Sequence, residues 1–472
     1  MIANMRVPPW RRWDTRSEME ARPLHYIAEA VKGRLVRGDG GTFVHRLITD
    51  SRKIQPEDLF LAIQGDRFDG HDYLEQVVQG GAAAVLVDRP VDVDCAVIEV
   101  DDTRSALGRF GARYRHDYHL PVVGVAGSNG KTTTKELLAS ILRRHFAAVW
   151  SEASFNNDIG VPLTLLKIEN FHHAAVLELG TNHHGELAGL VRMAAPQYGI
   201  LTSIGREHLE FFGNVEGVAQ EEGMLGELLP SSGKLFLYGD SEWSKPIAAR
   251  SAAPVCTVGF EAGNDWRAEN VETHSTGISF HAEGGISGEV RLSLLGRHQA
   301  TNALLAMAVA VELGVPPDAI LAGLAECRAP SRRLQAEELG GVCVIDDSYN
   351  ANADSVAAAL SVLADMPCEG RRIAVVGSMA ELGDDTGRAH EEAGTEAARC
   401  GIDVLFSVGS DARVTADAAL AAGVTEVEAF DNNVSAGEVL GLRVKAGDVV
   451  LLKGSRAARL EEVGDYLKKD RK

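Results

Sequence analysis

The sequence predicts an α/β protein with three domains, in which helices alternate with mainly parallel sheets. The first observation is length, because 472 residues exceed what one hydrophobic core usually serves, and domains commonly hold about 100–200 residues. The second is periodicity, since short β-branched runs alternate along the chain with segments of helical spacing. We place the domains at residues 1–100, 101–328 and 329–472.

The first domain is expected to be small and α/β. Apolar runs at residues 82–87 and 95–100 are separated by turn residues, as the strands of such a domain are. Roughly the first 20 residues are expected to form a loose extension. Pro8 and Pro9 interrupt them, and they lack the apolar run of a signal peptide.

The central domain is expected to hold a mainly parallel sheet of the phosphate-loop type. A β-branched run at residues 121–126 leads into a glycine-rich loop, and residues 135–146 follow with helical periodicity. Further strands are predicted at residues 174–179 and 198–203, each ending in polar residues. In such sheets the chemistry lies at the carboxyl ends of the strands.

The third domain is expected to be doubly wound and Rossmann-like, although it holds no convincing G-x-G-x-x-G motif. Its predicted strands are residues 342–346, 372–376, 404–408 and 448–452, and its predicted helices include residues 355–363 and 388–398. Strands that alternate with helices favour a parallel sheet here as well.

Charge and composition exclude several functions. The formal net charge of −20 argues against a protein that binds nucleic acid through a phosphate-neutralising surface. Six scattered cysteines without a C-x-x-C pair indicate neither a disulfide framework nor a zinc knuckle, which fits a reducing compartment. No stretch approaches a membrane span, so we expect a cytoplasmic protein without membrane insertion.

The strongest chemical signal lies in residues 124–132 (GVAGSNGKT). Glycines let backbone N–H groups approach phosphate oxygens, Lys131 can neutralise the β- and γ-phosphates, and the Thr132 hydroxyl can ligate Mg²⁺. Val125 stands where the usual pattern G-x-x-x-x-G-K-[ST] has its first glycine. The loop residues expected to bind ATP are Gly127, Ser128, Asn129, Gly130, Lys131, Thr132 and Thr133.

Residues 129–134 (NGKTTT) resemble the phosphate loop of the Mur ligase family, and other segments match in the same order over most of the chain. Residues 155–166 (FNNDIGVPLTLL), 346–352 (DDSYNAN) and 379–383 (MAELG) resemble the branch of the family that adds D-alanyl-D-alanine. The branch that adds diaminopimelate or lysine ranks second, because it would carry a different segment at residues 346–352.

The resemblance implies an ATP-dependent ligase of peptidoglycan precursor synthesis. The γ-phosphoryl group would pass to the terminal carboxylate of a UDP-N-acetylmuramoyl-tripeptide, and the amine of D-alanyl-D-alanine would then displace phosphate. A carboxylate needs this activation, because its oxygen is otherwise no leaving group. Crowded negative oxygens call for cations and directed N–H groups rather than a side-chain nucleophile.

The same resemblance gives catalytic roles to Lys131 and to three residues that would support a second magnesium. Glu178 and His208 match family positions that bind this ion, and carboxylate oxygen suits Mg²⁺ better than imidazole does. Glu222 stands where the family usually has a lysine that reacts with CO₂ to form a carbamate. A glutamate supplies the same negative charge without CO₂, so we expect Glu222 to support the metal; the alternative is an exposed helix charge.

Further binding residues follow from the resemblance alone. Asn302 would meet adenine, Arg333 the ATP phosphates and Asp347 the ribose, with Tyr349 and Asn350 beside the nucleotide. Arg332 is the alternative to Arg333 in this register. Residues expected to bind the UDP-sugar peptide are Ser51, Arg52, Asp69, His71, Asn156 and Asn157. The segment at residues 453–456 would lie near the dipeptide or the phosphates.

Several alternatives stay open at the level of sequence. Ligases that resemble folylpolyglutamate synthase or the cyanophycin-type enzymes use a similar loop, but residues 346–352 and the UDP-type first domain disfavour them. From another class, the chain could be a nucleotide-binding scaffold without turnover. The third residue of the tripeptide, a general base and the oligomeric state are not encoded in any motif, and a monomer is the simplest expectation.

Overall fold

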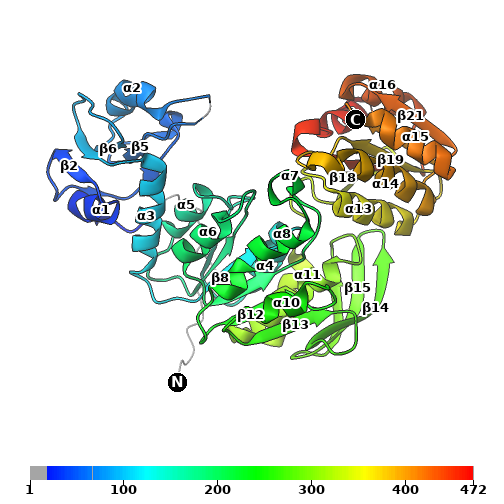
Figure 1. The fold of residues 1–472 in the computed structure, drawn as a ribbon, viewed down its shortest axis with the longest axis horizontal. Coiled ribbons are helices and arrows are strands. Elements are labelled where there is room, and N and C mark those ends of the chain that lie inside the picture. The colour runs from blue at the N-terminus through cyan, green and yellow to red at the C-terminus, as the bar shows by residue number, and fades with distance from the viewer. Residues whose placement is uncertain (1–18, 66, 471–472) are drawn as a thin grey trace. The chain divides into compact units, whose positions relative to one another are not determined.

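The computed structural model describes residues 19–65 and 67–470, which form two compact units. The first unit holds residues 19–119 and 158–171, and the second holds residues 120–157 and 172–470. In Figure 1 the chain runs from blue in the first unit to red at the end of the second. The expected N-terminal extension lies almost wholly outside the described residues.

The first unit is built on a five-stranded sheet with the order β2-β7-β6-β5-β4. Its strands are β2 (Arg34–Arg37), β4 (Leu47–Ile48), β5 (Leu59–Leu61), β6 (Ala84–Val87) and β7 (Ala96–Glu99). All neighbours pair in parallel except β2, which runs antiparallel to β7. The remaining elements are β1 (Arg22–Pro23), β3 (Phe43–Val44), α1 (Leu24–Ala30), α2 (Leu74–Gln79) and the short 3-10 helices η1 (Ser51–Lys53) and η2 (Gly70–Tyr73).

Two helices complete the first unit. The Asp102 carboxylate accepts the Ser105 N–H and so caps α3 (Thr103–Arg115), while the buried Tyr114 hydroxyl donates to Ile168 O at 2.8 Å. Helix α3 packs against α5 (Gly160–Leu165), where a side chain at Gly111 would collide with Pro162. The segment at residues 158–171 therefore folds with the first unit.

The second unit begins with a nine-stranded sheet in the order β16-β15-β14-β13-β12-β11-β8-β10-β9. The strands are β8 (Val122–Ala126), β9 (Ala148–Trp150), β10 (Ala174–Glu178), β11 (Tyr198–Leu201), β12 (Lys234–Tyr238), β13 (Val255–Gly259), β14 (Trp266–His274), β15 (Gly277–Glu283) and β16 (Gly288–Leu292). From β9 to β14 in this sheet order, all neighbouring strands pair in parallel. Strand β15 pairs antiparallel with both β14 and β16.

Helices cover this central sheet. They are α4 (Lys131–Leu142), α6 (Glu186–Ala194), α7 (Leu209–Phe212), α8 (Val215–Glu222), α9 (Met224–Glu227), α10 (Ser244–Ala248), α11 (Gln299–Glu312) and α12 (Pro317–Glu326). Helix α11 is buried from Gln299 to Ala310, because apolar residues surround it and it packs against both α4 and the sheet. Helix α4 is thereby held rigidly behind the glycine-rich loop.

The second unit also holds a six-stranded sheet in the order β17-β18-β22-β19-β20-β21. Its strands are β17 (Gln335–Leu339), β18 (Val342–Asp347), β19 (Arg372–Gly377), β20 (Val404–Val408), β21 (Glu426–Phe430) and β22 (Val449–Lys453); only β17 is antiparallel. The helices are α13 (Ala353–Asp365), α14 (Thr386–Arg399), α15 (Ala412–Ala422), α16 (Asn433–Arg443) and α17 (Glu461–Asp470), with 3-10 turns η3 (Gly383–Asp385) and η4 (Arg456–Ala458). Separate apolar clusters with α13–α15 and with α16–α17 make this sheet doubly wound.

The predicted α/β class and the mainly parallel sheets are confirmed. One boundary was wrong: the helix expected at residues 135–146 spans Lys131–Leu142, because the chain turns into the helix directly after Gly130. The antiparallel strands β14 to β16 were not predicted. The domain boundaries at residues 100 and 328 stay predictions. None of the helices in the described part of the chain combines the length and apolarity of a membrane span.

Candidate active site

The glycine-rich loop joins β8 to α4 at the carboxyl edge of the central sheet. Gly127 and Gly130 adopt φ values of 114° and 91°, which favour glycine, and a side chain at Gly130 would lie 2.6 Å from Asn302 Oδ1. The Ser128 N–H donates to Ser203 O at 2.7 Å, and the Asn129 N–H donates to Ser203 Oγ at 3.0 Å. The segment after β11 therefore braces the loop from the side.

Lys131 is the first residue of α4, and its side chain folds back over the loop. Its ammonium group donates to Gly127 O and lies 3.5 Å from Glu207 Oε2. Burial works against the charge, but the carboxylates of Glu207, Glu222 and Glu178 outweigh it and raise the pKa of Lys131. A permanent positive charge therefore sits where the loop would receive phosphate.

Glu178 ends β10 beside α4, and its carboxylate is almost completely buried. The Thr132 hydroxyl donates to Oε1 at 3.1 Å and the Asn156 amide donates to the same oxygen at 3.0 Å. Oε2 has no hydrogen-bond partner among the described residues, although Lys135 Nζ lies 3.7 Å away. Hydroxyl and carboxylate oxygens are the ligands that Mg²⁺ prefers, and an unsatisfied buried carboxylate oxygen suits a cation. Thr132 and Glu178 thus each offer oxygen that suits a predicted magnesium ion.

Glu222 is fully buried at the end of α8, under the glycine-rich loop. Its Oε2 accepts the Gly127 N–H at 2.7 Å, and its Oε1 has no hydrogen-bond partner in the described structure. Burial raises the pKa of Glu222, with Lys131 acting against this rise and Glu207 adding to it. The alternative of an exposed helix charge is wrong, because the packing of α8 carries this carboxylate into the site.

His208 precedes α7 in a left-handed conformation with φ of 49°. Its Nδ1 contacts Glu381 Oε2, and its Nε2 lies 4.0 Å from Glu207 Oε2. Within the described residues, no group of three or more His, Cys, Asp or Glu side chains is arranged as a metal site. The expected set of Glu178, His208 and Glu222 is thus not assembled here, since His208 engages the segment at residues 379–383 instead.

Arg333 approaches the same site from the segment before β17. Its guanidinium lies 4.2 Å from the centre of the Tyr349 ring and 3.4 Å from Ser154 Oγ, which is 3.5 Å from the Thr132 hydroxyl. Arg332 points elsewhere and pairs with Glu461 at 2.8 Å. The structure therefore brings Arg333, not Arg332, to the glycine-rich loop.

Two further predicted nucleotide residues, Asn302 and Asp347, form contacts with other side chains of the protein. The Asn302 amide donates to Gln299 Oε1 at 2.9 Å, and its oxygen faces Gly130. Asp347 pairs with Lys453 at 2.6 Å and accepts the Leu334 N–H at 3.1 Å. Burial raises the pKa of Asp347, although Lys453 opposes the rise. Lys453, from the segment expected near the dipeptide or phosphates, thus contacts the expected ribose ligand.

Lys453 also places two neighbours of Asp347. Its ammonium group donates to Asn350 O at 2.8 Å, so the turn that carries Tyr349 and Asn350 is held at the end of β18. Asn352, which caps α13, donates to the Asn129 side chain of the glycine-rich loop at 3.2 Å. The segment that carries the predicted nucleotide residues therefore contacts that loop through Asn352.

Sequence reasoning missed several residues of the site: Lys135, Ser154, Ser203 and Glu207. Lys135 is completely buried and donates to Ser151 O at 2.8 Å, so it supports the strand end that faces Glu178. A lysine on the apolar face of a predicted helix was the available signal. Glu207 had none, because its contact with Lys131 joins residues far apart in the sequence.

The predicted UDP residues of the first unit form two local clusters. Arg52 pairs with Asp50 at 2.8 Å, beside Ser51 in η1. Asp69 caps η2, contacts His71 Nδ1 at 2.6 Å and pairs with Arg89 at 2.8 Å. Asn156, by contrast, lies in the second unit with Glu178, and Asn157 follows it.

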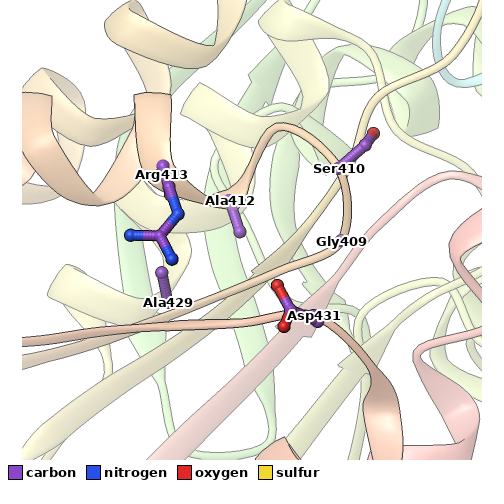
Figure 2. Close-up of a pocket in the computed structure, with 6 residues that line it drawn as sticks. All are labelled: Gly409, Ser410, Ala412, Arg413, Ala429 and Asp431. Atoms are coloured by element: carbon purple, nitrogen blue, oxygen red, sulfur yellow. The ribbon is translucent and has the colours of Figure 1, made fainter.

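A separate cavity of about 370 Å³ opens at the carboxyl ends of β20 and β21. Figure 2 shows two charged residues of its lining, Arg413 of α15 and Asp431 after β21, and the remaining lining residues are Gly409, Ser410, Ala412 and Ala429. None of the predicted site residues lines this cavity. It is therefore distinct from the site at the glycine-rich loop.

Comparison with known proteins matches the chain to three family descriptions. The Mur ligase middle domain matches residues 125–310, the Mur ligase glutamate ligase domain residues 332–456, and the Mur ligase family catalytic domain residues 43–115. A UDP-N-acetylmuramoyl-tripeptide--D-alanyl-D-alanine ligase of Escherichia coli (strain K12) is 37% identical, with 93% of this chain and 97% of the relative covered. The chain belongs to the Mur ligase family.

Other relatives and solved structures agree with this placement. The Bacillus subtilis (strain 168) ligase of the same name is 33% identical over 94% of this chain and 98% of its own. A MurF crystal structure from Acinetobacter baumannii superposes with a TM-score of 0.88 at 32% identity, covering 95% of this chain and 99% of that one. MurF from Thermotoga maritima in complex with ADP gives 0.81 at 27% identity, covering 90% and 97%.

As a Mur ligase, the chain is an ATP-dependent ligase, which confirms the enzyme class predicted from the sequence. Structures of a diaminopimelate ligase and a folylpolyglutamate synthase share only 16% and 17% identity with it, so they show the fold alone. The predicted three-domain Mur ligase architecture is confirmed as well.

Proposed function

We propose that this Mur ligase joins D-alanyl-D-alanine to UDP-N-acetylmuramoyl-tripeptide, giving UDP-N-acetylmuramoyl-pentapeptide, ADP and phosphate. The relatives that carry this activity in their names match the chain over nearly its whole length. The single structural observation that carries the proposal is the convergence of Lys131, the Thr132–Glu178 pair and Arg333 on one glycine-rich loop. Cations and oxygen ligands gathered there suit phosphoryl transfer.

ATP would occupy the loop from Gly127 to Thr133. Helix α4 begins directly after Gly130, so its first backbone N–H groups would bind phosphate, and Lys131 would exchange its contact with Gly127 O for the phosphate oxygens. Arg333 would meet the phosphates, and Asn302 the adenine. Asp347, Tyr349 and Asn350 would lie along the ribose and base, in keeping with their place at the end of β18.

Thr132 would hold one magnesium ion, with Glu178, His208 and Glu222 as candidates for a second. When bound, magnesium supplies positive charge that offsets the negative charge of the transferring phosphoryl group. Glu222 would act with one oxygen, because the other is bound to the Gly127 N–H. His208 would have to leave Glu381 before it could contribute.

The residues of this chain supply charge and position rather than a nucleophile. A carboxylate oxygen of the tripeptide forms a bond to the γ-phosphorus as the bond to the β-phosphate oxygen breaks and ADP departs. The dipeptide amine then attacks the acyl carbon and loses a proton to water, and phosphate leaves with the electron pair of the broken C–O bond. Lys131 and Arg333 would stabilise the negative oxygens in both steps.

Recognition of the nucleotide sugar would fall to the first unit, through Ser51, Arg52, Asp69 and His71. Asn156 and Asn157 would contact the acid substrate close to Glu178. We also propose that the protein acts in the cytoplasm as a monomer, where UDP-linked precursors and ATP are available. A gel-filtration mass of about twice the chain mass would show a dimer and contradict the proposed monomer.

Phosphate release by the purified chain tests the proposed function. Release should require ATP, UDP-N-acetylmuramoyl-tripeptide and D-alanyl-D-alanine together, with one phosphate formed for each pentapeptide detected by mass spectrometry. Release with UDP-N-acetylmuramoyl-dipeptide and diaminopimelate or lysine instead would assign the chain to the other branch. ATP binding without phosphate release in any combination of substrates would indicate a nucleotide-binding scaffold without turnover.

A further inference from the structure

Glu221, the neighbour of Glu222 on α8, is a buried carboxylate to which the predicted chemistry gives no role. Its Oε1 accepts the Leu187 N–H at 2.8 Å and lies 3.2 Å from the Thr181 hydroxyl. Its Oε2 accepts the Gly185 N–H at 2.8 Å. These bonds place a negative charge at the N-terminus of α6, where the helix dipole stabilises it. Glu221 thereby fixes both ends of the loop at residues 181–185.

The same loop is tied to the predicted magnesium carboxylate. It follows Glu178 by three residues, and the Gly180 N–H donates to Asn156 O at 2.8 Å, while the Asn156 amide donates to Glu178. On its outer side, Glu186 Oε2 accepts the Asn182 N–H at 2.8 Å. The backbone of the loop is therefore held by Glu221, by Asn156 at its start and by Glu186 on its outer side.

This rigid loop presents polar side chains to solvent. Asn182, His183 and His184 are exposed, and the Asn182 amide has no hydrogen-bond partner in the described part of the chain. The His183 ring lies 4.1 Å from that of Phe211, which limits its orientations. Amide and imidazole N–H groups are donors that suit carboxylates and peptide oxygens.

Adjacent glutamates of α8 hold adjacent loops. Strands β8 and β10 are parallel neighbours, so the loops that follow them lie at the same edge of the sheet. Glu222 binds the loop after β8 through Gly127, and Glu221 binds the loop after β10 through Gly185 and Leu187. Helix α8 thus sets the position of the loop at residues 181–185 relative to the phosphate-binding loop.

We propose that Glu221 is a positioning residue, which fixes the loop at residues 181–185 so that Asn182 and His183 bind the peptide end of the acid substrate. This inference rests on the proposed function, because it assigns the loop to the substrate whose carboxylate is phosphorylated. Asn182 and His183 contact Glu186 and Phe211 rather than the residues assigned to ATP. Loss of the Glu221 contacts should therefore weaken binding of the acid substrate and leave binding of ATP unchanged.

Steady-state kinetics of the full chain test the inference. Glu221→Gln keeps the size of the side chain but replaces one acceptor oxygen with a donor, which the Gly185 or Leu187 N–H cannot use. We expect KM for UDP-N-acetylmuramoyl-tripeptide to rise about tenfold or more, with KM for ATP and kcat within about threefold of the wild type. Glu216→Gln, an exposed change on the same helix, is the matched control and should leave all three constants unchanged.

A second variant keeps the test decisive if Glu221→Gln folds poorly. Asn182→Ala removes only an exposed side chain, and it should raise KM for the tripeptide substrate while leaving the melting temperature unchanged. An unchanged KM for that substrate in Asn182→Ala, or equal rises in the two KM values in Glu221→Gln, would overturn the inference. Turnover by the wild type in the same assay keeps this failure distinct from a failure of the proposed function.

Discussion

Oε2 of Glu222 accepts the backbone N–H of Gly127 at 2.7 Å, so a helix far along the chain holds the first turn of the phosphate-binding loop. The contact joins residues 95 positions apart in the sequence, and both groups are buried. A buried carboxylate that binds a backbone N–H restrains that backbone. The conformation of the loop therefore depends on a side chain outside it.

Replacement of Glu222 should impair the use of ATP. Glu222→Ala removes the acceptor for the Gly127 N–H, so we expect kcat/KM for ATP to fall about tenfold to hundredfold. Glu222→Gln retains an acceptor oxygen and should keep KM for ATP close to the wild-type value, while more Mg²⁺ is needed for half-maximal turnover. Unchanged magnesium dependence in Glu222→Ala would remove Glu222 from the proposed metal site.

Turnover should also be independent of dissolved CO₂. The carboxylate at position 222 is part of the side chain, so no reaction with bicarbonate is needed to create it. Rates measured in degassed buffer and in buffer with added bicarbonate should agree within experimental error. A rate that rises with bicarbonate would point to a carbamate elsewhere in the site.

Glu178→Gln should raise the magnesium concentration that half-maximal turnover requires by about tenfold or more, because an amide oxygen is a weaker ligand than a carboxylate. The titration should use saturating ATP and tripeptide substrate. Glu216→Gln provides a charge-matched control on the protein surface. Parallel curves for the wild type and Glu178→Gln would contradict the assignment of Glu178 to the metal.

Arg333 and Arg332 offer a matched pair of neighbouring arginines. Arg333→Ala should lower kcat/KM for ATP about hundredfold, since it removes a charge that reaches Ser154 and the glycine-rich loop. Arg332→Ala breaks an ion pair with Glu461 and should change activity by less than about threefold. Equal losses in the two variants would show that the register of this segment differs in the working enzyme.

His298 predicts a pH dependence of stability. Burial, with Lys453 adding to it, lowers the pKa of His298 from 6.5 to about 4. The unfolded chain therefore binds the proton first as the pH falls, so this contribution to stability is complete above pH 6.5 and is lost toward pH 4. The loss should reach at most about 3 kcal/mol.

Urea unfolding at several pH values checks this expectation. The free energy of unfolding of the wild type should fall more steeply between pH 6.5 and pH 4 than that of His298→Gln, which has no titrating group there. The two proteins should run parallel above pH 7, where both side chains are neutral. Parallel curves over the acid range as well would mean that His298 titrates in the folded protein as it does in the unfolded chain.

Local patterns made much of the fold and the loop predictable. The run of β-branched residues, the glycines and the helical segment after them placed β8, the loop and α4, apart from the four-residue error at the start of the helix. Strands β14 to β16 were not predicted, because charged residues alternate with the apolar residues that face the core. Alternation of this kind is typical of a sheet with one solvated side.

Contacts between distant segments were not predictable in the same way. The sequence of its own helix indicates a surface position for Glu222, and only the packing of α8 beneath the loop buries it. His208 carries no sign in its sequence that Glu381 will engage it, nor does Asp347 reveal its pairing with Lys453. Asp347 and Lys453 lie opposite each other on the neighbouring strands β18 and β22, and local patterns do not record which strands become neighbours.

Transfer of an oxygen atom from the acid substrate to phosphate tests the central claim most directly. UDP-N-acetylmuramoyl-tripeptide labelled with ¹⁸O in both oxygens of its terminal carboxylate would be turned over with ATP and D-alanyl-D-alanine. The account predicts that each released phosphate carries one ¹⁸O atom and that the pentapeptide retains the other in its new amide. Phosphate without label, or no pentapeptide at all, would contradict carboxylate activation at this site.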